Sequence, residues 1–367
     1  MPKLASSATL SSQALFRQDA RSLLARVETE ARDRIRSFDI TLPVTLGEKT
    51  NRSLLADIEV KAHCDGASLK TTPLKLDGTE VATAYSFERK LLGLATGIHD
   101  GVVTLSAHWA SHLTPWLWHR LQDLTAFELA IYRVAGSAMP KAAPDRFAIR
   151  NRSLTALMKA HTVQEVMPLG HSFEDVMEQL GQSTRRNVKR CLQLAAENNV
   201  EFSFSMDTPI PAAAHLRELS SHNMPRSKSF SKISSIVRFN AAQPRPYHAS
   251  LTNREGRSMS AAGGFIEGDL ALMAYQLNHR ADRDARPSLM LRALLIQQLI
   301  DCGVRYLAFI GGGGGLLLHA CERVSAPELL LISNTRSARI KHQACLLLQP
   351  NSRIARFSDS LPKAAEP

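Results

Sequence analysis

The second half of the chain alternates between strand-like and helix-like patterns of apolar residues. Within 200–206, Val200, Phe202, Phe204 and Met206 occupy every second position, which predicts a half-buried strand. Three more strand patterns follow, and the short polar segments between them are typical of hairpin loops. These three patterns lie at 246–252, 257–266 and 270–279.

A helix and a buried strand are predicted directly after these hairpins. Pro287 in the first turn and Gly303 just after the last apolar position predict a helix over 287–302. The apolar run 304–310 predicts a buried strand. Weaker patterns predict a helix and a last strand, near 314–323 and 328–333. This order of elements predicts an α/β or α+β sheet with helices packed on it.

Two helices are predicted before the first of these strands. Ser172 can cap a helix with an apolar face that includes Val176 and Leu180, and Ser183 can cap a second helix that ends near Glu197. The second helix carries two basic pairs at i, i+4 spacing, Arg185 with Lys189 and Arg186 with Arg190.

The first half of the chain gives weaker signals. Spaced apolar residues predict a helix over 12–36, and the mixed region 39–101 contains strand-like pieces. The dense apolar segment 113–137 predicts a buried helical element, and 140–144 (PKAAP) is the best linker candidate.

Composition limits the class of protein without choosing a function. The 367 residues, 44% hydrophobic and 22% charged, are typical of a folded protein with two domains or one large one. No apolar stretch approaches the roughly 20 residues of a membrane span, and no secretory signal pattern opens the chain, so we expect a cytoplasmic protein. The five cysteines form no C-x-x-C pair. The net charge of +11 favours an anionic partner such as nucleic acid, acidic lipid or a phosphorylated small molecule.

The clearest candidate for anion binding is the loop 280–286. It brings Arg280, Arg283 and Arg286 to the predicted start of the helix at Pro287, where Ser288 adds a hydroxyl. Helix starts present unpaired N–H groups, and arginine is suited to phosphate oxygens. The alternative is a solvated loop whose two acids, Asp282 and Asp284, partly neutralise the arginines. The glycine run 311–315 fits no nucleotide-binding fingerprint well.

Candidates for proton transfer are scattered. Tyr275 and His279 are four residues apart on one predicted strand and so share a face, and His319 follows the glycine run. Each could transfer a proton or simply pack in the core. His108 and His112 lack an H-E-x-x-H frame and an evident third ligand, so no metal site is expected.

Two segments resemble one family. The segment 167–198 (MPLGHSFEDVMEQLGQSTRRNVKRCLQLAAEN) resembles the entry to the CelD/BioF-like acetyltransferase domain of the GNAT superfamily, with its basic R-R-N-x-x-R helix. The segment 263–313 resembles its continuation, a meander followed by a helix and a strand that ends in glycine. The match covers roughly 165–335.

The resemblance implies an α/β (α+β) fold, a GNAT-like mixed sheet flanked by helices, in tandem with a degenerate N-terminal lobe. The domains expected from it are an N-terminal helix, a degenerate GNAT-like lobe, a GNAT-like acyltransferase domain and a polar tail. Their bounds are 1–40, 41–160, 161–350 and 351–367.

The resemblance also implies a site for acetyl-CoA or another acyl-CoA as co-substrate, without a metal. The strand 270–279 would part from 304–310, so that the pantetheine arm pairs with the backbone around Ala274, Gln276 and Asn278. The pyrophosphate would lie at the loop and helix start that the residues themselves indicate. The binding residues expected there are Arg280, Arg283, Arg286 and Ser288. The segment 280–288 contains no glycine, unlike the usual phosphate loop of the superfamily.

The implied reaction is direct acyl transfer to an amine or hydroxyl, with a base for the acceptor and an acid for the departing thiolate. His279 is the candidate base, because histidine titrates near neutral pH, and Tyr275 or His319 is the candidate acid.

Three functions therefore compete. The first is an acyl-CoA-dependent N- or O-acyltransferase with a small or envelope-related acceptor. The second is a Fem-like aminoacyl transferase whose donor is tRNA, with the basic helix around Arg185–Arg190 along its phosphates. The third is a non-catalytic binding protein that keeps the GNAT fold.

Overall fold

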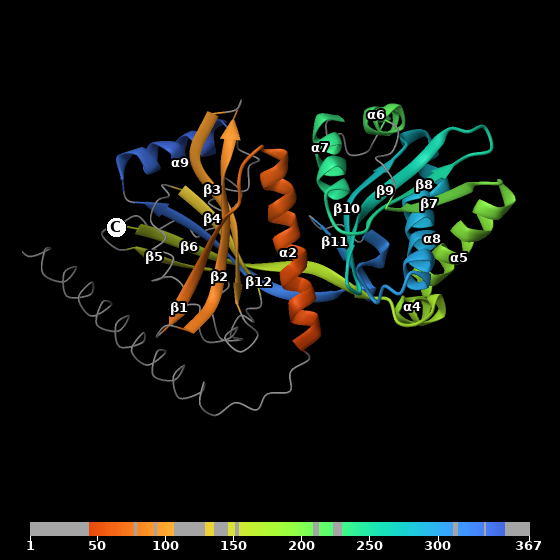
Figure 1. Cartoon of the computed structure of the whole chain (residues 1–367), viewed down its shortest axis with the longest axis horizontal. Helices are drawn as coiled ribbons and strands as arrows, with labels where there is room; N and C mark the ends of the chain where they lie inside the picture. Colours follow the sequence, from red (N-terminus) through yellow and green to blue (C-terminus); the bar gives the residue numbers. More distant parts are fainter. Residues whose placement is uncertain are drawn as a thin grey trace, which may run out of the picture.

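The computed structural model describes ten segments of the chain, shown in colour in Figure 1. They are residues 44–76, 79–91, 94–105, 129–135, 146–150, 154–207, 213–222, 230–310, 315–333 and 335–348. Several predicted features lie outside them. These are the helix 12–36, the pair His108 and His112, the linker 140–144, most of the glycine run and the tail 351–367.

Twelve strands of the described segments form one mixed sheet with two halves. In the N-terminal half the strands are β1 (Lys70–Leu76), β2 (Thr79–Leu91), β3 (Leu94–Leu105), β4 (Leu129–Ala135) and β5 (Arg146–Arg150), together with β12 (Glu322–Ser333). In the C-terminal half they are β7 (Glu201–Met206), β8 (Pro246–Thr252), β9 (Ser258–Glu267), β10 (Leu270–Asn278) and β11 (Tyr306–Phe309). Parallel pairs join β3 to β4 and β10 to β11, and the other pairs are antiparallel.

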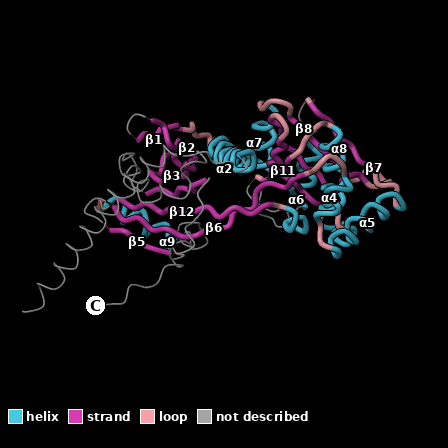
Figure 2. Tube along the Cα trace, turned by 90° about the horizontal axis from the view of Figure 1, so that it is seen from below, coloured by secondary structure: helices cyan, strands magenta, loops and turns pink. Residues whose placement is uncertain are grey.

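One long strand, β6 (Leu154–Pro168), joins the two halves. It pairs with β12 as far as Val166 and with β11 from Val166 to Pro168. Figure 2 shows β6 running from one half into the other. The two halves therefore share backbone hydrogen bonds.

Helices cover both faces of the C-terminal half. On one face α4 (Phe173–Gln179), α5 (Gln182–Glu197) and α8 (Pro287–Asp301) share a core with the sheet that includes Val188, Leu291 and Met273. On the other face α6 (Ala213–His222), α7 (Phe230–Ala241) and α2 (Val44–Cys64) share a core that includes Leu219, Ile236 and Tyr275. We call these the α8 face and the α7 face. The order from β7 to β11 is the one that the GNAT-like resemblance implies, and the predicted fold class is confirmed.

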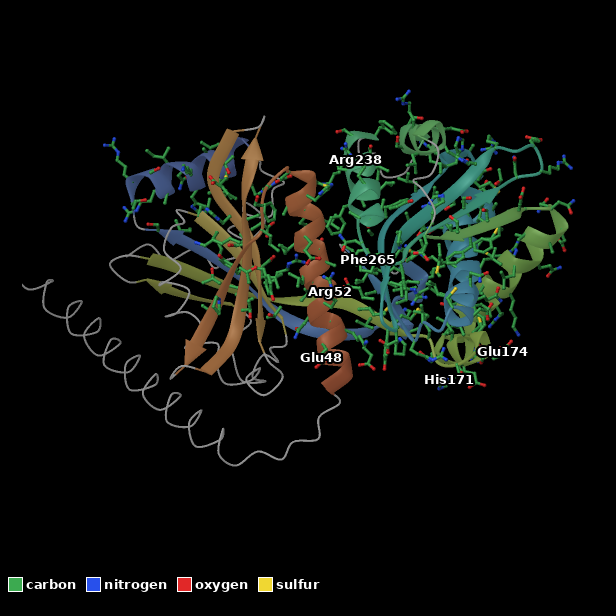
Figure 3. All side chains as sticks on the ribbon, viewed as in Figure 1. Glu48, Arg52, His171, Glu174, Arg238 and Phe265 are labelled. Atoms are coloured by element: carbon green, nitrogen blue, oxygen red, sulfur yellow. The ribbon has the colours of Figure 1, made fainter. Side chains whose placement is uncertain are left out.

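Helix α2 lies between the halves, and the sequence pattern did not predict it (Figures 1 and 3). Arg52 binds Glu267 of β9 through two hydrogen bonds of 2.5 Å and lies over the Phe265 ring, 5.8 Å from its centroid. On the opposite side Asp57 pairs with Arg133 of β4. Because α2 is packed on several sides, its buried positions include polar residues and do not form one apolar stripe.

Three local predictions need correction. Residues 129–135 are the strand β4 and not part of a helix, because Leu129 to Tyr132 are buried between β3 and β12, and a strand buried on both faces has no alternating pattern. Helix α5 begins at Gln182 after the cap Gly181, one residue before the expected cap Ser183. The segment after the glycine run is a short 3₁₀ helix, η3 (Gly315–Ala320), and β12 begins at Glu322.

One predicted cap is confirmed. The Ser172 side chain accepts a hydrogen bond from the backbone N–H of Asp175, and the Asp175 carboxylate accepts one from the backbone N–H of Ser172. This reciprocal pair fixes the start of α4.

Candidate functional site

The pairing of β10 with β11 ends partway along β10. Their pairing runs from Leu270 with Tyr306 to Met273 with Phe309, and the N–H of Ile310 donates the next bond to the Met273 carbonyl. β10 then continues to Asn278, paired with β9 on its other side. The described part of β11 is thus paired with β10 along its whole length, and Ala274–Asn278 lie beyond its end, so the parting predicted from the resemblance stays a prediction.

A β-bulge at this point sets which side chains point to each face. The register of β10 against β9 shifts between Met273 and Tyr275, so Ala274 is the extra residue. After the bulge Gln276 points to the α8 face, where it bonds to Ser288, and Tyr275 packs in the core of the α7 face.

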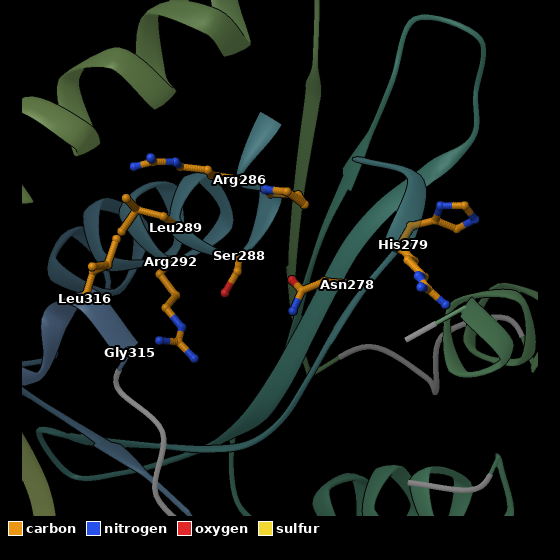
Figure 4. Close-up of a pocket in the computed structure, with 10 residues that line it drawn as sticks. Asn278, His279, Arg286, Ser288, Leu289, Arg292, Gly315 and Leu316 are labelled. Carbon is orange, nitrogen blue, oxygen red and sulfur yellow. The ribbon is translucent and has the colours of Figure 1, made fainter. Parts of the chain in front are cut away.

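A pocket of about 570 Å³ lies on the α8 face at the start of α8 (Figure 4). Four of the predicted binding residues line it together with other residues from β10, η2 (Arg280–Ala285), α8 and η3. The full set is Asn278, His279, Arg280, Arg286, Pro287, Ser288, Leu289, Arg292, Gly315 and Leu316.

The start of α8 has backbone geometry suited to an anion. Pro287 occupies the first turn, and the cap Arg286 adopts a left-handed conformation with φ of 51° and makes no side-chain cap bond. The N–H groups of Leu289 and Met290 both bond to the Arg286 carbonyl. The N-terminus of α8, which carries the partial positive charge of the helix dipole, faces the pocket, and this charge favours phosphate oxygens there.

Arg292 is a half-buried cation in this pocket that the sequence reasoning missed. Its Nε donates to the Gln276 side-chain oxygen at 2.6 Å, and its guanidinium lies 5.1 Å from the centroid of the Phe309 ring. The Gln276 amide nitrogen in turn donates to the Ser288 hydroxyl at 3.0 Å. Burial lowers the pKa of Arg292 to about 10. An arginine within the apolar pattern 287–302 was the available signal.

The loop η2 is fixed by an ion pair from outside the loop. Arg257, which precedes β9, binds both carboxylate oxygens of Asp282 at 2.7 Å. Asp282 is therefore engaged by Arg257. Arg280 and Arg286 are exposed, and Arg286 donates to the Asn187 side-chain oxygen of α5 at 2.7 Å. The side chain of Arg283 lies outside what the structure describes.

His279 lies at the edge of the pocket. Figure 4 shows its ring directed away from Ser288 and Arg292. Its Nδ1 accepts from the backbone N–H of Ala281 at 3.3 Å and lies 3.0 Å from the Arg257 guanidinium. The Asp282 carboxylate lies 3.5 Å from the same nitrogen, so Nδ1 faces an acceptor as well as these two donors.

Tyr275 forms a buried pair with His248 of β8, a residue that the sequence reasoning did not select. The Tyr275 hydroxyl lies 2.7 Å from His248 Nδ1. Gly263 of β9 pairs with both residues in register, and a Cβ at Gly263 would lie 2.6 Å from that hydroxyl oxygen. Burial, with a smaller contribution from His215 of α6, lowers the pKa of His248 to about 4. Burial also raises the pKa of Tyr275.

His319, the third candidate for proton transfer, is exposed in η3, the 3₁₀ helix whose first residues line the pocket. Within the described segments, no three His, Cys, Asp or Glu side chains are grouped to hold a metal ion. None of the described helices is long and apolar enough to cross a membrane.

No family model matches the chain, and no curated protein matches it. Three solved structures illustrate what the fold is similar to. A tandem GNAT protein from the clavulanic acid biosynthesis pathway is 10% identical, covers 78% of this chain and 95% of its own, and has a TM-score of 0.44. FemX is 10% identical, with coverage of 76% and 95% and a TM-score of 0.45. The C-terminal domain of a putative lysylphosphatidylglycerol synthetase from Agrobacterium fabrum is 11% identical, with coverage of 84% and 98% and a TM-score of 0.45. At these values the likeness describes the course of the chain and says nothing of what this protein binds.

Proposed function

We propose that this protein is an acyltransferase whose donor is an acyl-CoA, bound where β10 and β11 part. The observation that carries this proposal is the pocket at the start of α8, which joins a helix start without a side-chain cap, the Ser288 hydroxyl and the half-buried Arg292 to the end of β10. Within the GNAT superfamily we assign the chain to the CelD/BioF-like branch, on the strength of the segments 167–198 and 263–313.

The residues fit each part of such a donor. The backbone of Ala274–Asn278 beyond the end of β11 offers N–H and carbonyl groups to the pantetheine amides. The apolar side chains of Pro287, Leu289 and Leu316 suit the hydrocarbon part of the arm. The start of α8 and Ser288 suit the pyrophosphate. Arginines around it complete the proposed anion site, namely Arg280, Arg283, Arg286 and Arg292.

Direct transfer would join a nitrogen or oxygen of the acceptor to the acyl carbon, break the C–S bond and leave the CoA thiol after one proton moves from the acceptor to the thiolate. We propose Tyr275, His279 and His319 for this proton transfer. His279 is the proposed base for the acceptor, and the Tyr275 hydroxyl or the His319 ring is the proposed acid that protonates the departing thiolate. The acceptor would approach from the α7 face, where Tyr275 lies.

Ser288→Asp tests the donor site without weakening the helix. A carboxylate in the first turn of α8 is compatible with the helix dipole, but it repels a bound phosphate. We expect acetyl-CoA and free CoA to bind the wild-type protein with micromolar affinity in titration calorimetry. We expect Ser288→Asp to bind at least about tenfold more weakly, which corresponds to a loss of about 1.4 kcal/mol.

Ser288→Ala is the matched control, since it removes the hydroxyl without adding charge, and we expect its affinity to fall only about threefold, as for the loss of one ordinary hydrogen bond. Absence of heat with several acyl-CoA donors would overturn the proposal. Binding of aminoacyl-tRNA instead would favour the Fem-like alternative. Tight CoA binding without turnover across a panel of amine and hydroxyl acceptors would favour a non-catalytic role.

A further inference from the structure

Helix α5 exposes a short row of basic side chains. Arg186, Lys189 and Arg190 are exposed, whereas the opposite side of the helix buries Val188 and Cys191. Arg186 and Arg190 lie one turn apart at i, i+4. Like charges at this spacing destabilise a helix by about 0.2–0.5 kcal/mol, so the row costs stability.

This basic row lies beside the donor pocket. Arg286, which lines the pocket, donates to Asn187, the residue between Arg186 and Arg190 in this row. The charges of Arg286 and Arg190 both act on the Cys191 thiol and lower its pKa, although burial, the larger effect, raises it. Arg190 and Arg286 therefore both lie near Cys191. We call Arg186, Lys189, Arg190 and Arg286 the α5 patch.

The charge of the α5 patch is available to a partner. Within the described segments, the salt bridges of the structure do not include any of its four residues. The single acid of α5, Glu197, accepts a hydrogen bond from Gln193 at the far end of the helix. The exposed acid of the neighbouring loop, Asp284, is outnumbered by the arginines around it.

We propose that the α5 patch docks a small acidic protein that carries the acyl thioester on a phosphopantetheine arm. This inference rests on the proposed function and deepens it, because the same arm can arrive on CoA or on a carrier protein. CoA needs only the pocket, and no residue of α5 lines that pocket. A carrier protein needs in addition an anion-binding surface at the pocket mouth, which is where the α5 patch lies.

An acidic protein helix fits this surface better than RNA. Carboxylates at i, i+4 on a partner helix are about 6 Å apart along its axis, which matches the rise between Arg186 and Arg190. Single-stranded RNA binding usually relies on aromatic side chains for stacking, and the sequence of α5 contains none.

The test compares charge reversal on the α5 patch with reversal elsewhere. The probe is a bacterial acyl carrier protein in its holo and apo forms, titrated at physiological salt. We expect the holo form to bind the wild-type protein, and Arg186→Glu with Arg190→Glu to weaken that binding at least about tenfold by replacing attraction with repulsion. We expect CoA affinity to fall much less than carrier affinity, because no residue of α5 lines the pocket.

Arg336→Glu with Arg339→Glu is the matched control, because both residues are exposed on α9 (Arg336–Leu348) in the other half of the molecule. We expect this variant to bind the carrier like the wild type. Arg186→Gln with Arg190→Gln is a milder second variant. We expect its affinity for the carrier to lie between that of the wild type and that of the charge-reversal variant.

Equal carrier affinity in wild type and reversal, or no carrier binding at all, would overturn the proposal. If CoA still binds in those cases, the proposed function stands and only the carrier inference fails. If neither CoA nor carrier binds, the proposed function fails first. Binding of tRNA that the reversal abolishes, without carrier binding, would assign the α5 patch to nucleic acid.

Discussion

Gly263 shows how one residue without a side chain can assemble a polar pair across three strands. His248, Gly263 and Tyr275 lie in one row over β8, β9 and β10. Only a hydrogen atom fits at Gly263 below the Tyr275 hydroxyl. The ring of Tyr275 can therefore reach across β9 to His248, and neither polar atom of the pair is left unsatisfied in the core.

The His248 ring makes stability depend on pH. Its folded-state pKa of about 4 lies below the ordinary value of 6.5, so the unfolded chain binds more protons between these values. The free energy of unfolding should thus rise with pH through this window, and this contribution, at most about 3 kcal/mol, should be lost as pH falls from about 7 to about 4.

The measurement is urea unfolding of wild type and His248→Gln at a series of pH values. Other partly buried histidines, such as His99 and His342, also have lowered pKa values, and their effect is common to both proteins. We expect the difference in stability between the two proteins to narrow as pH falls toward 4. A difference that is constant across this range would contradict the role given to His248.

At the scale of elements, α2 is fixed to β4 by a buried ion pair. Asp57 is 7% exposed and Arg133 is 9% exposed as side chains, and Lys61 bonds to the same carboxylate at 2.7 Å. Burial alone would raise the pKa of Asp57, but the charges of Arg133 and Lys61 more than offset it and hold that pKa well below its usual range. The carboxylate is therefore ionised under all ordinary conditions.

Removal of one partner of this ion pair should be costly. We expect Asp57→Asn to lower the free energy of unfolding by about 3–5 kcal/mol, because it leaves Arg133 as a buried charge without its carboxylate. Asp57→Leu combined with Arg133→Met should cost much less, because both charges leave together. Denaturant unfolding of the three proteins checks this, and a double variant no more stable than Asp57→Asn would refute the account.

Sequence patterns predicted elements well where turn signals or helix-end signals mark their limits. Strand β7 follows the alternation that predicted it, whereas β9, β10 and α8 are largely buried on all sides and were predicted from hairpin loops and from Pro and Gly signals. Helix α2 and strand β4 were missed because both are buried on several sides, so their apolar residues have no clear period. The crossing of β6 between the halves depends on pairings with β11 and β12, far away in sequence.

The residues of the candidate site also differ in whether the sequence alone could select them. Ser288 and Arg286 could be selected from the sequence because they stand at a recognisable helix start. Arg292 and His248 could not, because their importance arises from distant contacts, with Phe309 and Gln276 for the first and with Tyr275 across Gly263 for the second. Local patterns indicate where a ligand can bind, whereas tertiary packing determines which buried groups face it.

In the whole molecule, the two halves are connected by β6, by β12 and by α2 with its ion pairs on both sides. The donor pocket lies in the C-terminal half, and the α5 patch lies beside it. The proposed acyl-CoA site, its carrier partner and its acceptor face are therefore all assigned to elements between α4 and η3.

The central claim is that an acyl-CoA binds along β10 beyond its pairing with β11 and at the start of α8. Hydrogen–deuterium exchange with and without acetyl-CoA tests this claim most directly, because it maps protected amides along the chain. The account predicts slower exchange in peptides that cover Ala274–Asn278 and Arg286–Met290, with little change in β1 to β3. Protection confined to other segments, or none at saturating acetyl-CoA, would contradict it.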